Sequence, residues 1–135
     1  MLEVYIDGSC RGNGTEKAIG GLGIISYKDG IKYASMQLRL LEPVTNNEAE
    51  YAALMYALNL IMGLKDKIII YSDSKLVVNQ VNKKWKIKTE HLRKPCAVCQ
   101  EGMACFENIT LQWLPRQKNQ EANDLAQSIT EVSND

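Results

Sequence analysis

The sequence has no net charge, because its 16 basic residues balance its 16 acidic ones. It therefore lacks the positive excess that marks many nucleic-acid and membrane-surface proteins, and only a local cluster of charge can indicate such a partner. It also lacks any run approaching the ~20 apolar residues of a membrane span, so no membrane partner is expected. No signal or transit sequence precedes the first strand, which predicts a cytoplasmic protein with reduced cysteines.

Internal repeats, low-complexity segments and interdomain linkers are also missing. Of the 135 residues, 45% are apolar and 24% are charged, as in a globular domain with a hydrophobic core. We therefore expect a single, monomeric domain over residues 1–130 and a flexible tail at 131–135.

The first strand is predicted at residues 2–9, just before a glycine-rich stretch. Side chains of a strand alternate between its faces, so Val4 and Ile6 share one face and Asp7 lies on the other. A carboxylate at the end of an apolar strand is unfavourable unless something pairs with it. Asp7 could cap the turn that follows, or it could bind a metal ion.

The rest of the chain alternates between strand and helix patterns. Strands are predicted at 20–27 and 31–41, joined by a tight turn at Asp29-Gly30, and at 67–72 and 109–114. Helices are predicted from Thr45 or Asn46 to about Gly63, at 74–81, from about 91 to 103, and from Asn119 or Gln120 onward. This order predicts an α/β domain whose five-stranded mixed sheet, an antiparallel three-strand meander plus two parallel strands, is flanked by helices.

Hydrophobic spacing also predicts which faces are buried. The strand at 31–41 should bury one face, formed by Ala34, Met36, Leu38 and Leu40. The nearly all-apolar strand at 67–72 should be buried on both faces. The first helix should bury a stripe that includes Tyr56 and Leu60, and the last should bury Ala122, Leu125, Ala126 and Ile129, with Asp124 beside them.

Four carboxylates stand at corresponding ends of these elements. Asp7 and Asp73 follow strands, whereas Glu50 and Asp124 lie near helix starts. In open α/β sheets, ligands gather at the carboxyl ends of strands, where these side chains could meet. Clustered carboxylates raise one another's pKa, and a hard divalent cation relieves that conflict. Asp73 taken alone would be better explained as a helix cap, but the four carboxylates together favour a metal site.

On these residues the chain resembles the type 1 ribonuclease H family over nearly its whole length, as a short, stand-alone archaeal or bacterial type that lacks the basic protrusion. The matching segments are Asp7-Gly8-Ser9-Cys10 with Gly12-Asn13, Gly20-Gly21-Leu22-Gly23, Thr45-Asn46-Asn47 with Glu50, Ser72-Asp73-Ser74, and Asn119 with Ala122 and Asp124-Leu125-Ala126. The resemblance implies a ribonuclease H-like fold.

The resemblance also implies an activity, namely endonucleolytic hydrolysis of the RNA strand of an RNA/DNA hybrid, leaving 5′-phosphate and 3′-hydroxyl ends. The catalytic residues would be Asp7, Glu50, Asp73 and Asp124, holding two Mg²⁺ ions for which Mn²⁺ can substitute. By the same resemblance, substrate contacts would come from Asn13, Thr45, Asn46, Asn47, Ser74 and Arg116. Arg116 stands in the loop where many members carry a histidine, and the sole histidine, His91, is elsewhere.

A basic loop at 82–88 is the one strong charge cluster. It holds four lysines around Trp85, and an aromatic side chain among lysines favours a nucleic-acid contact, so Lys84 and Trp85 are added to the substrate-binding set.

Three other hypotheses remain. The chain could be a different nuclease or strand-transfer protein of the ribonuclease H superfamily, although Asn13, Asn46 and Asn47 favour ribonuclease H. It could be a non-catalytic nucleic-acid-binding module. It could also be a zinc-stabilised interaction domain, since four residues offer possible ligands: His91, Cys96, Cys99 and Cys105. Cys96 and Cys99 fall on the apolar stripe of their helix, which favours core packing over zinc.

Overall fold

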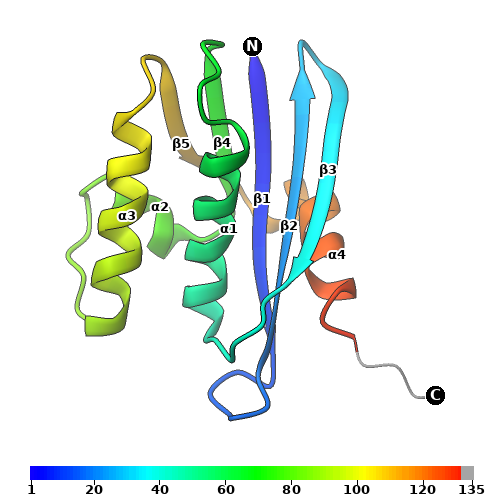
Figure 1. Ribbon diagram of the computed structural model, residues 1–135, viewed down its shortest axis with the longest axis vertical. Coiled ribbons are helices and arrows are strands. Elements are labelled where there is room, and N and C mark those ends of the chain that lie inside the picture. The colour runs from blue at the N-terminus through cyan, green and yellow to red at the C-terminus, as the bar shows by residue number, and fades with distance from the viewer. Residues whose placement is uncertain (132–135) are drawn as a thin grey trace.

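The computed structural model describes residues 1–131, in which five strands form a single mixed sheet. The strands are β1 (Leu2–Arg11), β2 (Ile19–Lys28), β3 (Ile31–Arg39), β4 (Ile68–Ser72) and β5 (Ile109–Trp113). Their order across the sheet is β3-β2-β1-β4-β5, with antiparallel pairing among β1, β2 and β3 and parallel pairing of β1, β4 and β5 (Figure 1). The predicted meander plus two parallel strands is confirmed, and β1 is the central strand.

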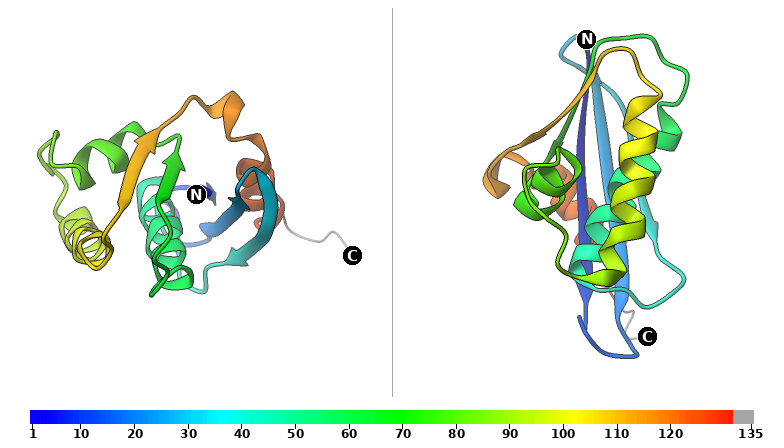
Figure 2. Two further views of the ribbon diagram at one scale, coloured as in Figure 1. Left: turned by 90° about the horizontal axis from the view of Figure 1, so that it is seen from above. Right: turned by 90° about the vertical axis from the view of Figure 1, so that its left-hand side faces the viewer.

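Helices cover both faces of this sheet. They are α1 (Asn46–Leu60), α2 (Lys75–Val81), α3 (Arg93–Ala104) and α4 (Gln120–Ser128), with short 3-10 turns at η1 (Glu90–Leu92) and η2 (Arg116–Lys118). Figures 1 and 2 show α1 and α3 on one face and α4 on the other, where it packs on β1 and β2. None of the helices within residues 1–131 has the length and apolar character needed to cross a membrane.

Two glycines allow helices to approach the sheet closely. A Cβ at Gly8 would overlap the backbone carbonyl of Ala49 in α1, and a Cβ at Gly23 would overlap that of Ala122 in α4. Because Gly23 pairs with Asp7 in the β1–β2 ladder, the contact at Gly23 brings α4 next to Asp7. The glycines therefore position both helices that meet the carboxyl-terminal half of β1.

The predicted burial of β3 and β4 is only partly correct. On β3, Ala34 is exposed, and Met36, Leu38 and Leu40 are half-buried, because β3 is an edge strand and α1 packs mainly on β1 and β2. The strand β4 buries the face with Ile68 and Ile70 but leaves the other face half-exposed. The helix α4 packs on β1 and β2 and does not extend over this second face of β4. Tyr71 on this face stacks on Tyr5, with ring centroids 4.9 Å apart.

The predicted stripe of α1 is wrong at two positions. Tyr56 and Leu60 are 41% and 58% exposed, whereas Tyr51, which was not predicted, is fully buried. Leu60 borders an apolar hollow of about 300 Å³ between the end of α1 and β3, where no helix packs. Of the tail predicted at 131–135, all but Glu131 lies outside the described residues.

Candidate active site

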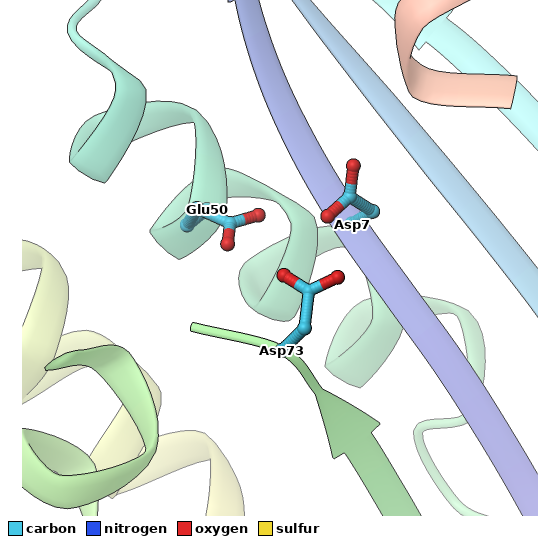
Figure 3. Close-up of side chains that lie close together, drawn as sticks. All are labelled: Asp7, Glu50 and Asp73. Carbon is cyan, nitrogen blue, oxygen red and sulfur yellow. The ribbon is translucent and has the colours of Figure 1, made fainter. Parts of the chain in front are cut away.

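Three carboxylates meet at the carboxyl end of the two central parallel strands. Asp7 belongs to β1, Glu50 to α1, and Asp73 directly follows β4 (Figure 3). One carboxylate oxygen from each residue lies within 4.8 Å of the others, and within residues 1–131 no other group of three His, Cys, Asp or Glu side chains is so close. The predicted adjacency of Asp7 and Asp73 is confirmed, because β1 and β4 are parallel neighbours. We call these three residues the acidic triad.

Asp73 is available to the triad because it does not cap α2. Ser74 is the N-cap residue, and its hydroxyl accepts a hydrogen bond from the Val77 amide at 3.2 Å. Ser72 accepts one from the Ser74 amide at 3.1 Å, which secures the turn between β4 and α2. The backbone carbonyl of Asp73 accepts a hydrogen bond from the indole of Trp113 at 3.1 Å. The side chain of Asp73 is therefore left to face the other two carboxylates.

The two glutamates at the start of α1 have different roles. Glu48 forms a capping box with Thr45, since its carboxylate accepts from the Thr45 amide at 2.9 Å and its own amide donates to the Thr45 hydroxyl at 3.2 Å. Glu50 lies across the helix and accepts a hydrogen bond from the backbone amide of Gly8. A separation of two residues corresponds to about 200° of helical rotation, so only one of the two glutamates can face Asp7 and Asp73.

Burial and mutual repulsion raise the pKa values within the triad. Desolvation by burial, followed by the negative charge of Asp73, raises the pKa of Asp7 to about 7. Desolvation and then the charges of Asp7 and Asp73 raise the pKa of Glu50 well above its ordinary value. The positive charge of Arg116 opposes both increases. A set of oxygen ligands with this much uncompensated negative charge fits a hard divalent cation.

Asp124 does not join the triad. It is exposed on α4, and its carboxylate accepts a hydrogen bond from the Gln120 side chain at 2.6 Å. The preceding residue, Asn123, is buried and its side-chain amide donates to Asp7 Oδ2 at 3.1 Å. The structure thus brings together three of the four predicted carboxylates, and an amide lies on α4 where the fourth was expected.

Asn119 was expected to start the last helix and belongs to a segment that matches the family, but no role in the site was predicted for it. It is the N-cap residue of α4 but makes no side-chain capping bond. Its buried amide instead donates to the Ile6 carbonyl at 2.8 Å and to Asp73 Oδ2 at 3.2 Å. Asn119 and Asn123 share a helix face with two buried alanines, Ala122 and Ala126. That spacing of three and four residues is the sequence signal that could have identified both asparagines.

Several predicted substrate residues border the triad. A cleft of about 400 Å³ is lined by the triad together with Asn46, Asn47, Ser74 and Arg116. Asn13 lies in the loop between β1 and β2, and its side-chain oxygen accepts a hydrogen bond from the Asn46 amide at 2.9 Å. The side chain of Thr45 takes part in the capping box.

Lys84 and Trp85 lie apart from this cleft, on the loop that follows α2. Both side chains are exposed, with Trp85 at 49%. Trp85 borders a different hollow of about 370 Å³, which Lys83, Lys86 and Arg93 also line. The structure therefore does not bring the basic loop into the cleft of the triad.

The possible zinc ligands are dispersed. Cys96 and Cys99 are fully buried in the hydrophobic core, as the helical spacing predicted, whereas Cys105 and His91 are exposed. Burial raises the pKa of the Cys99 thiol to about 12. A thiol that stays protonated is a poor metal ligand, which supports core packing.

Comparison with known proteins is consistent with this geometry. A model of the family described as "Reverse transcriptase-like" matches residues 5–129. A ribonuclease H from Clostridium botulinum is 42% identical over 88 residues, which cover 61% of this chain and 53% of the relative. The chain thus spans about half the length of this curated relative.

Two solved structures are similar over nearly the whole chain. RNase H1 from Halobacterium salinarum NRC-1 has a TM-score of 0.82 and 31% identity, covering 94% of this chain and 95% of that one. LC11-RNase H1, in complex with an RNA/DNA hybrid, has a TM-score of 0.83 and 28% identity, with 95% of each chain covered. By fold, by the family match and by these relatives, the chain belongs to the type 1 ribonuclease H family.

Proposed function

We propose that this chain is a metal-dependent endoribonuclease that cuts the RNA strand of RNA/DNA hybrids. The observation that carries the proposal is the acidic triad, which lies in a cleft also lined by Asn46, Asn47 and Arg116. Membership of the ribonuclease H family, and the hybrid bound by the similar LC11 enzyme, support this substrate class.

The triad is the proposed metal-binding set. Asp7, Glu50 and Asp73 would hold divalent cations, with Mg²⁺ as the expected ion and Mn²⁺ as a substitute. Two bound ions would supply an activated water and stabilise the departing 3′ oxygen, leaving a 5′-phosphate and a 3′-hydroxyl. The protein contributes the fixed positions of the carboxylates. The Gly8 amide holds Glu50, and the side-chain amides of Asn123 and Asn119 hold Asp7 and Asp73.

Polar groups around the triad would bind the hybrid. The side chains of Asn46 and Asn47 border the cleft, where amides can donate to and accept from the 2′-hydroxyls that distinguish RNA from DNA. Asn13 supports this end of α1 through its hydrogen bond to the Asn46 amide. Arg116 stays charged at neutral pH, so its proposed role is to bind a phosphate and not to act as a base.

Two further contacts are proposed outside this group. Ser74 lines the cleft on the Asp73 side, and Thr45 keeps its hydroxyl hydrogen free to donate to a DNA-strand phosphate. Lys84 and Trp85 would extend the backbone contacts along the duplex. The protein is proposed to act as a cytoplasmic monomer.

One assay tests the proposal. The protein is incubated with labelled RNA/DNA hybrid, RNA duplex, DNA duplex and single strands, each with Mg²⁺, Mn²⁺ or chelator. We expect internal cuts in the RNA strand of the hybrid with either cation and no cuts in chelator. Cleavage of the DNA duplex would indicate a different superfamily nuclease, and binding without cleavage would indicate a non-catalytic module. An intact hybrid at every cation concentration would overturn the proposal.

A further inference from the structure

The helix α4 contacts the acidic triad through the side-chain amide of Asn123, whereas the neighbouring carboxylate of Asp124 points away from the triad. Asn123 is 5% exposed and donates to Asp7 Oδ2 at 3.1 Å. Asp124, one residue later, is exposed and bonded to Gln120 on its own helix. One residue corresponds to about 100° of helical rotation, so Asn123 and Asp124 cannot both face Asp7.

The packing of α4 prevents the helix from rotating to exchange these two residues. Ala122 and Ala126 are 1% and 0% exposed, and the carbonyl of Ala122 sits where a side chain at Gly23 would be. Asn119 fixes the start of the helix through its bonds to Ile6 and Asp73. A rotation of about 100° would bring exposed residues into these contacts and break the bonds of Asn119. The orientation of α4 is therefore set by the core, and Asn123 is the residue it directs to Asp7.

We propose that Asn123 takes the place of a fourth acidic residue at the cation site, which is thus built from three carboxylates and one neutral amide, and that Asp124 takes no part in it. This inference rests on the proposed metal-dependent function. In the observed conformation the amide is a positioning group, because its donated hydrogen bond orients Asp7. A half-turn of the same amide would instead offer Oδ1, a neutral oxygen of the kind that hard cations accept. Neither orientation adds negative charge.

The charge of the site is the measurable consequence. The triad carries at most three negative charges, and the positive charge of Arg116 acts on the same carboxylates. A fourth carboxylate a few ångströms from a divalent cation would attract it strongly even at an effective dielectric constant of about 20. Replacing Asn123 by aspartate should therefore tighten cation binding, whereas changes at Asp124 should have little effect. A purely structural role for Asn123 would not produce a gain in affinity.

Binding of Mn²⁺ alone, without nucleic acid, tests this directly. Titrations followed by the free-ion electron paramagnetic resonance signal would compare the wild type with Asn123→Asp and Asp124→Asn. We expect Asn123→Asp to bind Mn²⁺ at least about tenfold more tightly. We expect Asp124→Asn to stay within about twofold of the wild type, since exposed charges contribute little.

Asn123→Asp could fail to fold without a cation, because it adds a buried carboxylate beside Asp7. Circular dichroism identifies that case, and recovery of the fold on adding Mn²⁺ would support the proposal. Asn123→Ala and Asp124→Ala then form a second matched pair. We expect Asn123→Ala to weaken Mn²⁺ binding at least about threefold because Asp7 loses its donor, and Asp124→Ala to leave it unchanged.

Three results would overturn the inference. The first is a folded Asn123→Asp that binds Mn²⁺ no more tightly than the wild type. The second is a loss of Mn²⁺ affinity in the Asp124 variants with no loss in Asn123→Ala. The third is a wild type that binds no Mn²⁺. Hybrid cleavage by the wild type is measured separately. Failure of the proposed function would appear as an intact hybrid in that assay, whereas a wrong inference about Asn123 would leave hybrid cleavage in place and appear in the Mn²⁺ titrations.

Discussion

In the absence of metal, the acidic triad should make the free energy of unfolding fall as pH rises through the acid to neutral range. The ordinary pKa of an aspartate here is 3.8, and in the folded protein burial and the charge of Asp73 raise that of Asp7 to about 7. Between these values the folded state keeps a proton on Asp7 that the unfolded state has released. Folding then takes up a proton, so the stability that neutral Asp7 provides at low pH is lost as pH increases from about 4 to about 7.

The size of this effect follows from the difference in pKa. A rise from 3.8 to about 7 is about three pH units. At about 1.4 kcal/mol per unit, it corresponds to a loss of about 4 kcal/mol once Asp7 is fully ionised. Most single domains are stable by only 5–15 kcal/mol, so such a loss should be readily measured. The raised pKa of Glu50 acts in the same direction.

Urea unfolding in chelator, between pH 4.5 and pH 8, would measure this loss. The matched control is Asp7→Asn, which has a similar shape and cannot ionise. We expect the wild type to lose about 3 kcal/mol relative to Asp7→Asn across this range, because about 1 kcal/mol of the total is already lost below pH 4.5. Asp29 and Glu121 have lowered pKa values, but they act near pH 4 and equally in both proteins, so they cancel in the comparison.

Adding Mg²⁺ at pH 8 should restore stability to the wild type and much less to Asp7→Asn, because a ligand that binds only the folded state stabilises it. Parallel pH curves for the two proteins would refute the reasoning. They would mean that ionising Asp7 in the metal-free fold costs no free energy of unfolding, because water reaches the carboxylates of the triad.

Three further predictions concern other parts of the site. Glu50→Gln should remove nearly all cleavage of a hybrid while thermal denaturation shows an intact fold, whereas Glu48→Gln, which keeps a capping box, should retain most activity; the opposite pattern would mean that the wrong glutamate has been placed in the triad. Gly23→Ala should destabilise the protein by about 1–3 kcal/mol in urea unfolding, because α4 must move off β2 and carry Asn123 away from Asp7; unchanged stability would show that α4 adjusts freely. The last change replaces the four lysines of the basic loop, Lys83, Lys84, Lys86 and Lys88. It should weaken hybrid binding and make the slope of log affinity against log salt shallower by roughly one for each lost phosphate contact. An unchanged slope would place these lysines outside the binding surface.

Much of this protein could be predicted from local patterns in its sequence. The alternation of apolar residues and the Asp29-Gly30 turn predicted the antiparallel meander, because both depend on neighbours in the chain. The separation of Glu48 from Glu50 was also predictable, since it depends only on helical rotation. Asp7 and Asp73 could be paired in advance because each ends an apolar strand, and the ends of parallel neighbouring strands meet at one edge of a sheet.

Only the tertiary structure determined which residue of α4 reaches the triad and which apolar side chains stay exposed. Sequence patterns place apolar residues inside and polar ones outside, so they favoured Leu125 over Asn123 for the buried face. Asn123 is nevertheless buried, because Asp7 offers its amide a hydrogen-bond acceptor that offsets the penalty of desolvation. Tyr56 and Leu60 have the spacing of core residues, yet both are exposed, and Leu60 borders an open hollow beside β3 at the edge of the sheet. In both cases the burial of a side chain depends on which distant segments of the chain pack beside it, and local periodicity carries no information about that.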